Sequence, residues 1–175
     1  MTLNIFQREE MNTKNTCILH VEDDENDVIL LPHAFEEAGI SNPVHVASDG
    51  KQAIDYLAMA ARGTDPRVYP MPCLVLLDLK IPFISGLDVL HWARQQTGLV
   101  DLPIIVLTSS ENPTDVSLAY KFGASSFVVK PFEREERLRL AQGLNLWWIE
   151  KNLCPENSGD HSRSKREPLV ALHCA

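Results

Sequence analysis

The 175-residue sequence lacks several features that mark particular classes of protein. Its four cysteines, Cys17, Cys73, Cys154 and Cys174, do not have the Cys-x-x-Cys spacing of zinc or redox sites. The histidines His20, His33, His45 and His91 also lack ligand spacing, so we expect structural or surface roles for them. No apolar run could span a bilayer, and the N-terminus lacks the charged, apolar and small-residue order of a secretory signal. We therefore expect a cytoplasmic protein without a membrane partner.

Positive charge is also scarce. Lysine and arginine number 16 against 24 aspartates and glutamates, which gives a formal net charge of −8. The basic cluster at 163–166 lies in a polar tail with acidic neighbours. Because a nucleic-acid-binding surface needs a concentrated basic face, we expect no nucleic-acid partner. With 45% apolar residues, the composition is that of a globular protein.

The most informative stretch is 73–82, where five apolar residues run into Asp78 and Pro82 stops regular pairing. An unbroken apolar run of this length is typical of a strand buried on both faces, as in a parallel sheet. Such sheets place their chemistry at the carboxyl ends of the strands. Taken alone, Asp78 could equally be a functional carboxylate or the cap of a turn.

Strand and helix patterns alternate along the chain. Strands are predicted at 17–21, 44–47, 73–77, 104–107 and 126–129, and helices at 26–38, 51–61, 87–96, 114–122 and 133–152. Alternation favours an α/β fold with a doubly wound, five-stranded parallel sheet in the flavodoxin-like order 2-1-3-4-5. Pro32 should bend the first helix or confine its regular part to the later turns. We predict a flexible leader over 1–15, one domain over 16–153 and a disordered tail over 154–175.

Polar side chains follow four of the predicted strands: Glu22 and Asp23, then Asp78, Thr108 and Lys130. The first and third strands are neighbours at the switch point of the sheet, so their carboxylates should meet there. Clustered carboxylate oxygens suit Mg²⁺ and not zinc. With Mg²⁺ on one side, the lysine ammonium on the other and the threonine hydroxyl on a third oxygen, Asp78 could attack phosphorus. The pattern predicts a site that forms an acyl phosphate on Asp78.

These residues together resemble the receiver domain of bacterial two-component response regulators, over about 16–153. The matching positions are Glu22-Asp23, Asp78, Pro82, Gly86, Thr108, Phe127 and Lys130-Pro131. The spacings also agree, with 30 residues from Asp78 to Thr108 and 22 from Thr108 to Lys130. The long loop before Pro72 and the Trp147-Trp148 pair look most like stand-alone receivers that partner phytochrome-type histidine kinases.

The resemblance implies how the phosphoacceptor site works. Asp78 would take a phosphoryl group from a phosphohistidine on a sensor histidine kinase, such as a bacteriophytochrome. Asp23, Asp78 and the backbone carbonyl of Lys80 would hold Mg²⁺. Glu22 stands where aspartate is commoner, and it would act on the metal through water.

The resemblance also implies a switch. The hydroxyl of Thr108 would be drawn toward the phosphate, and the ring of Phe127 would turn inward into the vacated space. Ser109, beside Thr108 at the phosphate, stands where a smaller residue is usual. Lys80 and Ser110 flank the path of the attacking water, so we expect them to tune dephosphorylation.

Output is expected to pass through protein contacts, because the chain ends too soon after residue 153 for a folded DNA-binding module. Apolar residues on several faces of the helix at 133–152 either form a partner surface or cover the chain's own loop. By resemblance, a homodimer would use the fourth helix (114–122), the fifth strand (126–129) and this fifth helix.

Two other functions share the aspartate chemistry. A phosphatase of the haloacid-dehalogenase type needs a second aspartate two residues after the nucleophile, where this chain has Lys80. A pseudo-receiver that has lost phosphorylation would lack part of the acidic pair, Asp78 or Lys130, and none of these is missing. A phosphoacceptor that is not itself an enzyme is therefore the preferred interpretation.

Overall fold

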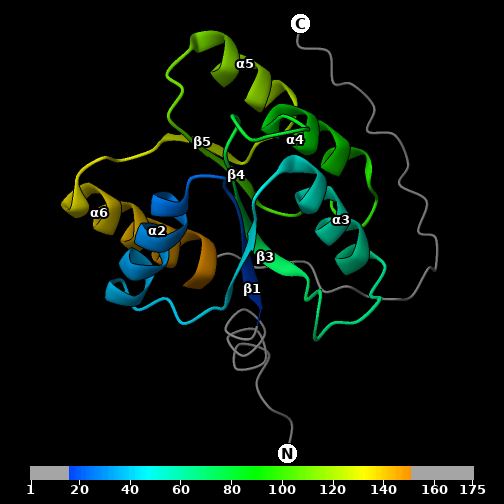
Figure 1. Ribbon diagram of the computed structural model, residues 1–175, viewed down its shortest axis with the longest axis horizontal. Helices are drawn as coiled ribbons and strands as arrows, with labels where there is room; N and C mark the ends of the chain where they lie inside the picture. The colour runs from blue at the N-terminus through cyan, green and yellow to red at the C-terminus, as the bar shows by residue number, and fades with distance from the viewer. Residues whose placement is uncertain (1–15, 151–175) are drawn as a thin grey trace, which may run out of the picture.

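The computed structural model describes residues 16–150, in which strands and helices alternate (Figure 1). The strands are β1 (Cys17–Val21), β2 (Val44–Ala47), β3 (Pro72–Leu77), β4 (Ile104–Thr108) and β5 (Ser126–Val129). The helices are α2 (Glu25–Glu37), α3 (Gly50–Ala61), α4 (Gly86–Gln95), α5 (Pro113–Lys121), α6 (Arg134–Leu144) and the π-helix η1 (Asn145–Glu150). The leader at 1–15 and the tail at 154–175 lie outside the described residues.

The five strands form one parallel sheet in the order β2-β1-β3-β4-β5, which confirms the predicted topology. In the pairing, Val21 of β1 lies opposite Leu77 of β3, and Leu77 lies opposite Val106 of β4. The central strands therefore end close to the same level, and the residues that follow them meet at one edge of the sheet.

Helices cover both faces of the sheet, α2 and α6 on one and α3, α4 and α5 on the other (Figure 1). Successive residues of β3 alternate between the two cores: Val75 and Leu77 pack under α3 and α4, whereas Leu74 and Leu76 pack under α2 and α6. This two-residue period explains why the strand must be apolar at every position. All six residues of β3 are buried.

Short polar side chains begin the helices. Asp24 caps α2 by accepting hydrogen bonds from the backbone N–H groups of Asn26 and Asp27, and Asp49 and Ser85 cap α3 and α4 in the same way. Helix α2 continues through Pro32, so this proline does not confine the helix to its later turns. The cap at Asp24 holds the first turn of the helix, and burial of Leu31, Ala34 and Phe35 anchors the later turns, so the helix tolerates the hydrogen bond lost at Pro32.

The last helix differs from its prediction. In place of one α-helix over 133–152, α6 ends at Leu144 and continues as the π-helix η1, while residues 151 and 152 lie outside the described part. Ile149 is buried and Trp148 packs against the core beneath α2, but Trp147 is 68% exposed.

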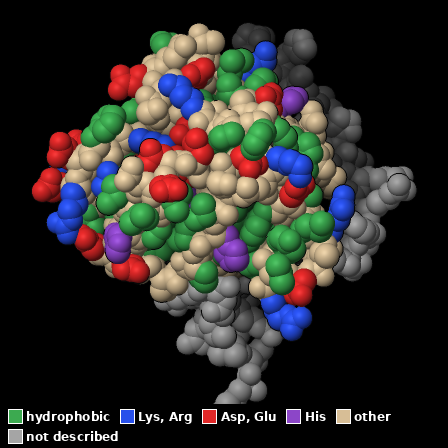
Figure 2. All heavy atoms as spheres, viewed as in Figure 1, with side chains coloured by type: hydrophobic (Ala, Val, Ile, Leu, Met, Phe, Trp, Pro, Cys, Tyr) green, Lys and Arg blue, Asp and Glu red, His purple; other side chains and the backbone are tan. Residues whose placement is uncertain are grey.

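The face in Figure 2 carries acidic, basic and apolar side chains intermixed. Among the described helices, none combines the length and the apolar character needed to cross a membrane.

Candidate functional site

The carboxyl ends of the strands bring the predicted site residues together. The N–H of Asp78 donates to the carbonyl of Val21 (3.0 Å), and the N–H of Lys130 donates to the carbonyl of Thr108 (2.9 Å). Pairing thus extends one residue beyond the strands, so Asp78 and Lys130 are held on rigid backbone.

The ammonium of Lys130 lies at the centre of the site. Its Nζ is 2.8 Å from Asp78 Oδ2, 2.5 Å from Glu22 Oε2 and 2.9 Å from Asp27 Oδ2. Asp27 was not among the residues predicted from the sequence to form the site. The available signal was its place in the first turn of α2, three residues after the cap Asp24, but acidic residues are common there for their interaction with the helix dipole.

An acidic cluster lies beside this ammonium. Glu22, Asp23 and Asp78 each offer a carboxylate oxygen, and the three oxygens lie within 4.8 Å of one another. Glu22 and Asp78 are buried, whereas Asp23 is exposed. This set of hard oxygen donors fits Mg²⁺ or a similar divalent ion, which prefers few protein ligands and retains water. The backbone N–H of Lys80 donates to Asp78 Oδ1 (3.1 Å), so this residue is also at the site.

Charge neighbours keep Asp78 ionised. Burial alone would raise the pKa of Asp78, but hydrogen bonds from Lys130, Thr108 and the backbone N–H of Lys80 hold it below its usual value. Burial alone would lower the pKa of Lys130, but its carboxylate partners, chiefly Asp78, raise it well above the usual value. Asp78 is therefore a carboxylate and Lys130 a cation throughout the neutral pH range.

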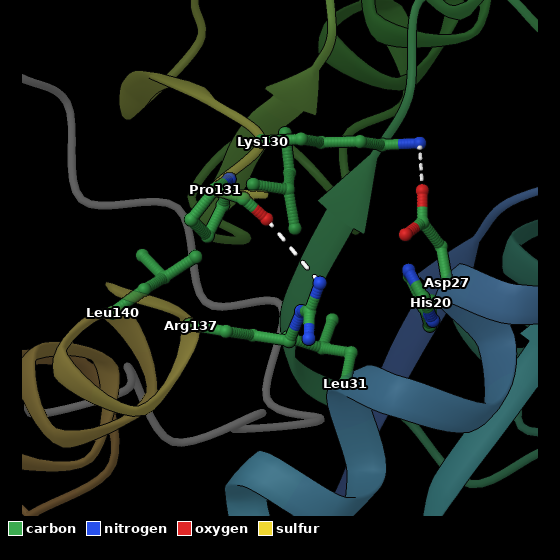
Figure 3. Close-up of a pocket in the computed structure, with 8 residues that line it drawn as sticks. His20, Asp27, Leu31, Lys130, Pro131, Arg137 and Leu140 are labelled. Carbon is green, nitrogen blue, oxygen red and sulfur yellow. Dashed lines mark hydrogen bonds and ion pairs between the residues drawn. The ribbon is translucent and has the colours of Figure 1, made fainter. Parts of the chain in front are cut away.

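Two further buried groups have shifted pKa values, Glu22 within the ion cluster and His20 beside it. Burial raises the pKa of Glu22, and the neighbouring Lys130 offsets only part of this rise. Burial, assisted by the charge of Lys130, lowers the pKa of His20 to about 4. His20 therefore lies in the core as a neutral imidazole, with Nε2 3.7 Å from Glu22 Oε2. It borders a cavity of about 20 Å³ beneath Lys130, which has room for about one water molecule (Figure 3).

The residues after β4 are divided between the site and α5. Thr108 is fully buried, hydrogen-bonds Asp78, and accepts a hydrogen bond at Oγ1 from the N–H of Ser110 (3.3 Å). Ser109 is exposed. The hydroxyl of Ser110 donates to Asp115 Oδ2 (2.5 Å), so in this conformation it is engaged by the first turn of α5.

Phe127, the predicted switch aromatic, is half-buried on β5. Its ring packs against the core under α3, α4 and α5, and its backbone N–H donates to the hydroxyl of Tyr120 (3.3 Å). Tyr120 itself is 52% exposed.

The loop after Asp78 folds back closely on itself. A Cβ atom at Gly86 would collide with the carbonyl oxygen of Asp78 and the Cα of Leu79. The N–H of Gly86 also donates to the carbonyl of Leu79 (3.1 Å). Only glycine fits this approach, which brings the start of α4 against the phosphoacceptor loop.

The fold and this arrangement at the strand ends are those of a receiver domain. Residues 18–142 match the response regulator receiver domain family, and the chain belongs to that family, a class of phosphoacceptor signalling domains. The resemblance stated from the sequence, and the flavodoxin-like receiver fold, are thereby confirmed.

Similar proteins include stand-alone receivers. The probable methanogenesis regulatory protein FilR2 of Methanothrix harundinacea is 33% identical over 79% of this chain and 86% of its own. The Mn²⁺-bound crystal structure of the response regulator Rcp1 of Synechocystis sp. is 28% identical, with a TM-score of 0.70 over 80% of this chain and 99% of Rcp1. The bacteriophytochrome response regulator AtBRR is 37% identical, with a TM-score of 0.58 over 74% of this chain and 93% of AtBRR.

Proposed function

We propose that this protein is a Mg²⁺-dependent phosphoacceptor that takes a phosphoryl group from a sensor histidine kinase onto Asp78. The observation that carries the proposal is the position of the Asp78 carboxylate, which contacts the Lys130 ammonium at 2.8 Å and forms the acidic cluster with Glu22 and Asp23. A cation and a cluster of potential metal ligands at the same carboxylate are what an incoming phosphoryl group needs for charge neutralisation.

The reaction on Asp78 is a displacement at phosphorus. A carboxylate oxygen of Asp78 forms the new P–O bond, and the bond from phosphorus to the donor breaks, with its electron pair leaving on the kinase imidazole. Lys130 and the Thr108 hydroxyl, both hydrogen-bonded to Asp78, are placed to contact the transferred oxygens. Dephosphorylation restores the free carboxylate of Asp78. Water attacks phosphorus, the bond from phosphorus to the Asp78 oxygen breaks, and phosphate is released.

Mg²⁺ would be held by Asp23, Asp78 and the backbone carbonyl of Lys80, with Glu22 acting through water. When bound, the ion supplies positive charge opposite Lys130 and orients the phosphoryl oxygens. The relative Rcp1 has been crystallised with Mn²⁺, which has the same preference for oxygen ligands.

The conformational signal would pass through Thr108 and Phe127. Movement of the Thr108 hydroxyl toward the phosphoryl group would open space beside β5 for the half-buried ring. Ser109 would border the phosphate, while Lys80 and Ser110 would tune its hydrolysis. Release of the Ser110 hydroxyl from Asp115 would be needed before it could face the attacking water.

The proposed partners are a histidine kinase and a second copy of this chain. A bacteriophytochrome-type kinase is supported by the relative AtBRR, which is a bacteriophytochrome response regulator. A homodimer through α5, β5 and α6 is supported by exposed apolar side chains on or beside these elements, namely Tyr120, Val129, Phe132 and, on η1, Trp147. A cytoplasmic location is supported by the buried thiol of Cys17, which is not in a disulfide and fits a reducing compartment.

The test is incubation with acetyl phosphate, with and without Mg²⁺, followed by intact mass measurement. We expect a mass increase of one phosphoryl group that needs Mg²⁺ and is lost in Asp78→Asn. Asp88→Asn, on an exposed helix start, is the matched control and should be modified like the wild type. An unmodified wild type would support the pseudo-receiver, and turnover of many phosphate esters per protein would support the phosphatase.

A further inference from the structure

The three carboxylates around the Lys130 ammonium do not have equivalent tasks. Asp78 is the proposed acceptor, so its oxygens change partners when the phosphoryl group arrives. Glu22 belongs to the acidic cluster, so a bound metal ion competes for its oxygens. Asp27 is outside that cluster, yet its Oδ2 accepts a hydrogen bond from Lys130 Nζ at 2.9 Å. It is the one of the three whose contact can persist through the reaction.

Asp27 is presented from fixed backbone. It lies in the first turn of α2, where its own N–H is held by the capping carboxylate of Asp24. The buried residues Leu31 and Phe35 fix the same helix to the sheet. In Figure 3 the Asp27 carboxylate and the Lys130 ammonium point toward one another and are joined by a hydrogen bond, and both residues line the small cavity together with His20. The lysine is thus tied to α2 at one end of its side chain and to β5 at the other.

Lys130 needs such a tether. Its side chain is long and has many rotamers, and its ammonium has three N–H donors that can rotate freely. When Asp78 is phosphorylated and a bound metal ion competes for Glu22, Asp27 would be the remaining carboxylate that keeps the ammonium beside the ends of β1 and β3. Positioning of a reacting group within a fraction of an ångström has large effects on rate.

We propose that Asp27 is a positioning residue for phosphotransfer, which holds the Lys130 ammonium from α2 while Asp78 and Glu22 exchange their partners. This inference rests on the proposed function of Asp78 as phosphoacceptor. Asp27 contacts neither the metal cluster nor the reacting atoms, and it acts only through the lysine.

Four variants separate position from charge. Asp27→Ala removes the acceptor oxygen, Asp27→Asn keeps an oxygen without charge, and Asp27→Glu keeps the charge but moves the oxygen by one methylene. The matched control is Glu25→Gln, which removes one charge from the same turn of α2 at an exposed carboxylate that is not among the three around Lys130. Rates of phosphorylation are measured by intact mass with acetyl phosphate at saturating Mg²⁺, over a range of donor concentrations.

We expect Asp27→Ala to lower the maximal rate about tenfold, which corresponds to the loss of one charge-assisted hydrogen bond. Asp27→Asn should stay within about threefold of the wild type, because the amide oxygen still accepts from Lys130. Asp27→Glu should be slowed, and Glu25→Gln should match the wild type. Mg²⁺ affinity and the urea midpoint of Asp27→Ala should change little, whereas a merely structural role would lower both together with the rate.

Several results would overturn the proposal. A wild-type or faster rate in Asp27→Ala would mean that Asp27 is idle or competes with the phosphoryl group for Lys130. If Asp27→Asn is phosphorylated as slowly as Asp27→Ala, the effect belongs to charge alone. The same conclusion follows if Glu25→Gln loses as much of the phosphorylation rate as Asp27→Ala. If the wild type itself takes no phosphoryl group, the proposed function fails and this inference with it. Should Asp27→Ala not fold, the comparison of Asp27→Asn with Asp27→Glu decides.

Discussion

The buried imidazole of His20 makes the stability of this protein depend on pH in a predictable direction. Its side chain is 2% exposed, and its Nδ1 has no hydrogen-bond partner among the residues that the structure describes. Burial beside Lys130 lowers its pKa to about 4, against 6.5 in an unfolded chain. Between these two values the unfolded chain binds more protons than the folded protein, so stability falls as the pH is lowered through this window.

The magnitude follows from the two pKa values. The gap between 6.5 and about 4 corresponds to about 3 kcal/mol when fully developed, and about 2 kcal/mol of this is lost by pH 5. His20→Leu removes the titrating group and the unpaired buried nitrogen at similar volume. We expect the free energy of unfolding of this variant to exceed that of the wild type by about 1–2 kcal/mol at pH 7.5, because the unpaired nitrogen of His20 is removed. At pH 5 the advantage should grow by about 2 kcal/mol.

Urea unfolding at pH 7.5 and pH 5, without Mg²⁺, measures this difference. With a slope of about 2 kcal/mol/M, the gap between the midpoints of His20→Leu and the wild type should widen by about 1 M on acidification. His33→Gln is the control, since it removes a histidine whose side chain is 68% exposed, and its midpoint should follow the wild type. A gap for His20→Leu that stays constant or shrinks between the two pH values would refute a neutral buried imidazole.

Three further outcomes follow from the site. Lys130→Met should lower the free energy of unfolding by about 3–5 kcal/mol at pH 7.5, because Asp78 is left buried without its counter-charge; urea titration measures this, and an unchanged midpoint would contradict it. Mg²⁺ at 100 times its Kd should raise the free energy of unfolding of the wild type by about 2.7 kcal/mol. If the same Mg²⁺ concentration stabilised Asp23→Asn as much, the acidic cluster would not be the metal site. Gly86→Ala should destabilise by about 1–3 kcal/mol and slow acetyl-phosphate labelling, since the added methyl displaces the Asp78 loop; wild-type labelling kinetics would count against this.

The central part of the fold could be predicted because it depends on local patterns. The unbroken apolar run before Asp78 reflects a strand that faces two cores, and the alternation of strands with helices leaves few topologies open. The strand-end residues could be identified for the same reason, since parallel strands present their carboxyl ends at one edge.

Contacts between distant elements could not be predicted in this way. Asp27 has the sequence context of an ordinary first-turn carboxylate, and its contact with Lys130 joins residues 103 apart in the chain. His20 lies within an apolar run, where neither its partners nor the cavity that it borders can be inferred from neighbours in sequence. The change from α-helix to π-helix after Leu144 likewise depends on how Trp148 and Ile149 meet the core.

The charge balance of the site connects metal binding to phosphorylation. Three carboxylates, those of Glu22, Asp27 and Asp78, contact the Lys130 ammonium, and Asp23 adds a fourth through the acidic cluster, which leaves the site a formal charge of −3. A phosphoryl donor carries further negative charge, so its approach is unfavourable until a divalent cation reduces that surplus. Asp27 adds to this surplus of negative charge. Its presence is explained if its hydrogen bond to Lys130 outweighs the repulsion that it adds. Because Asp27→Asn removes the repulsion and keeps the acceptor, its rate relative to the wild type at subsaturating Mg²⁺ measures how these two effects balance.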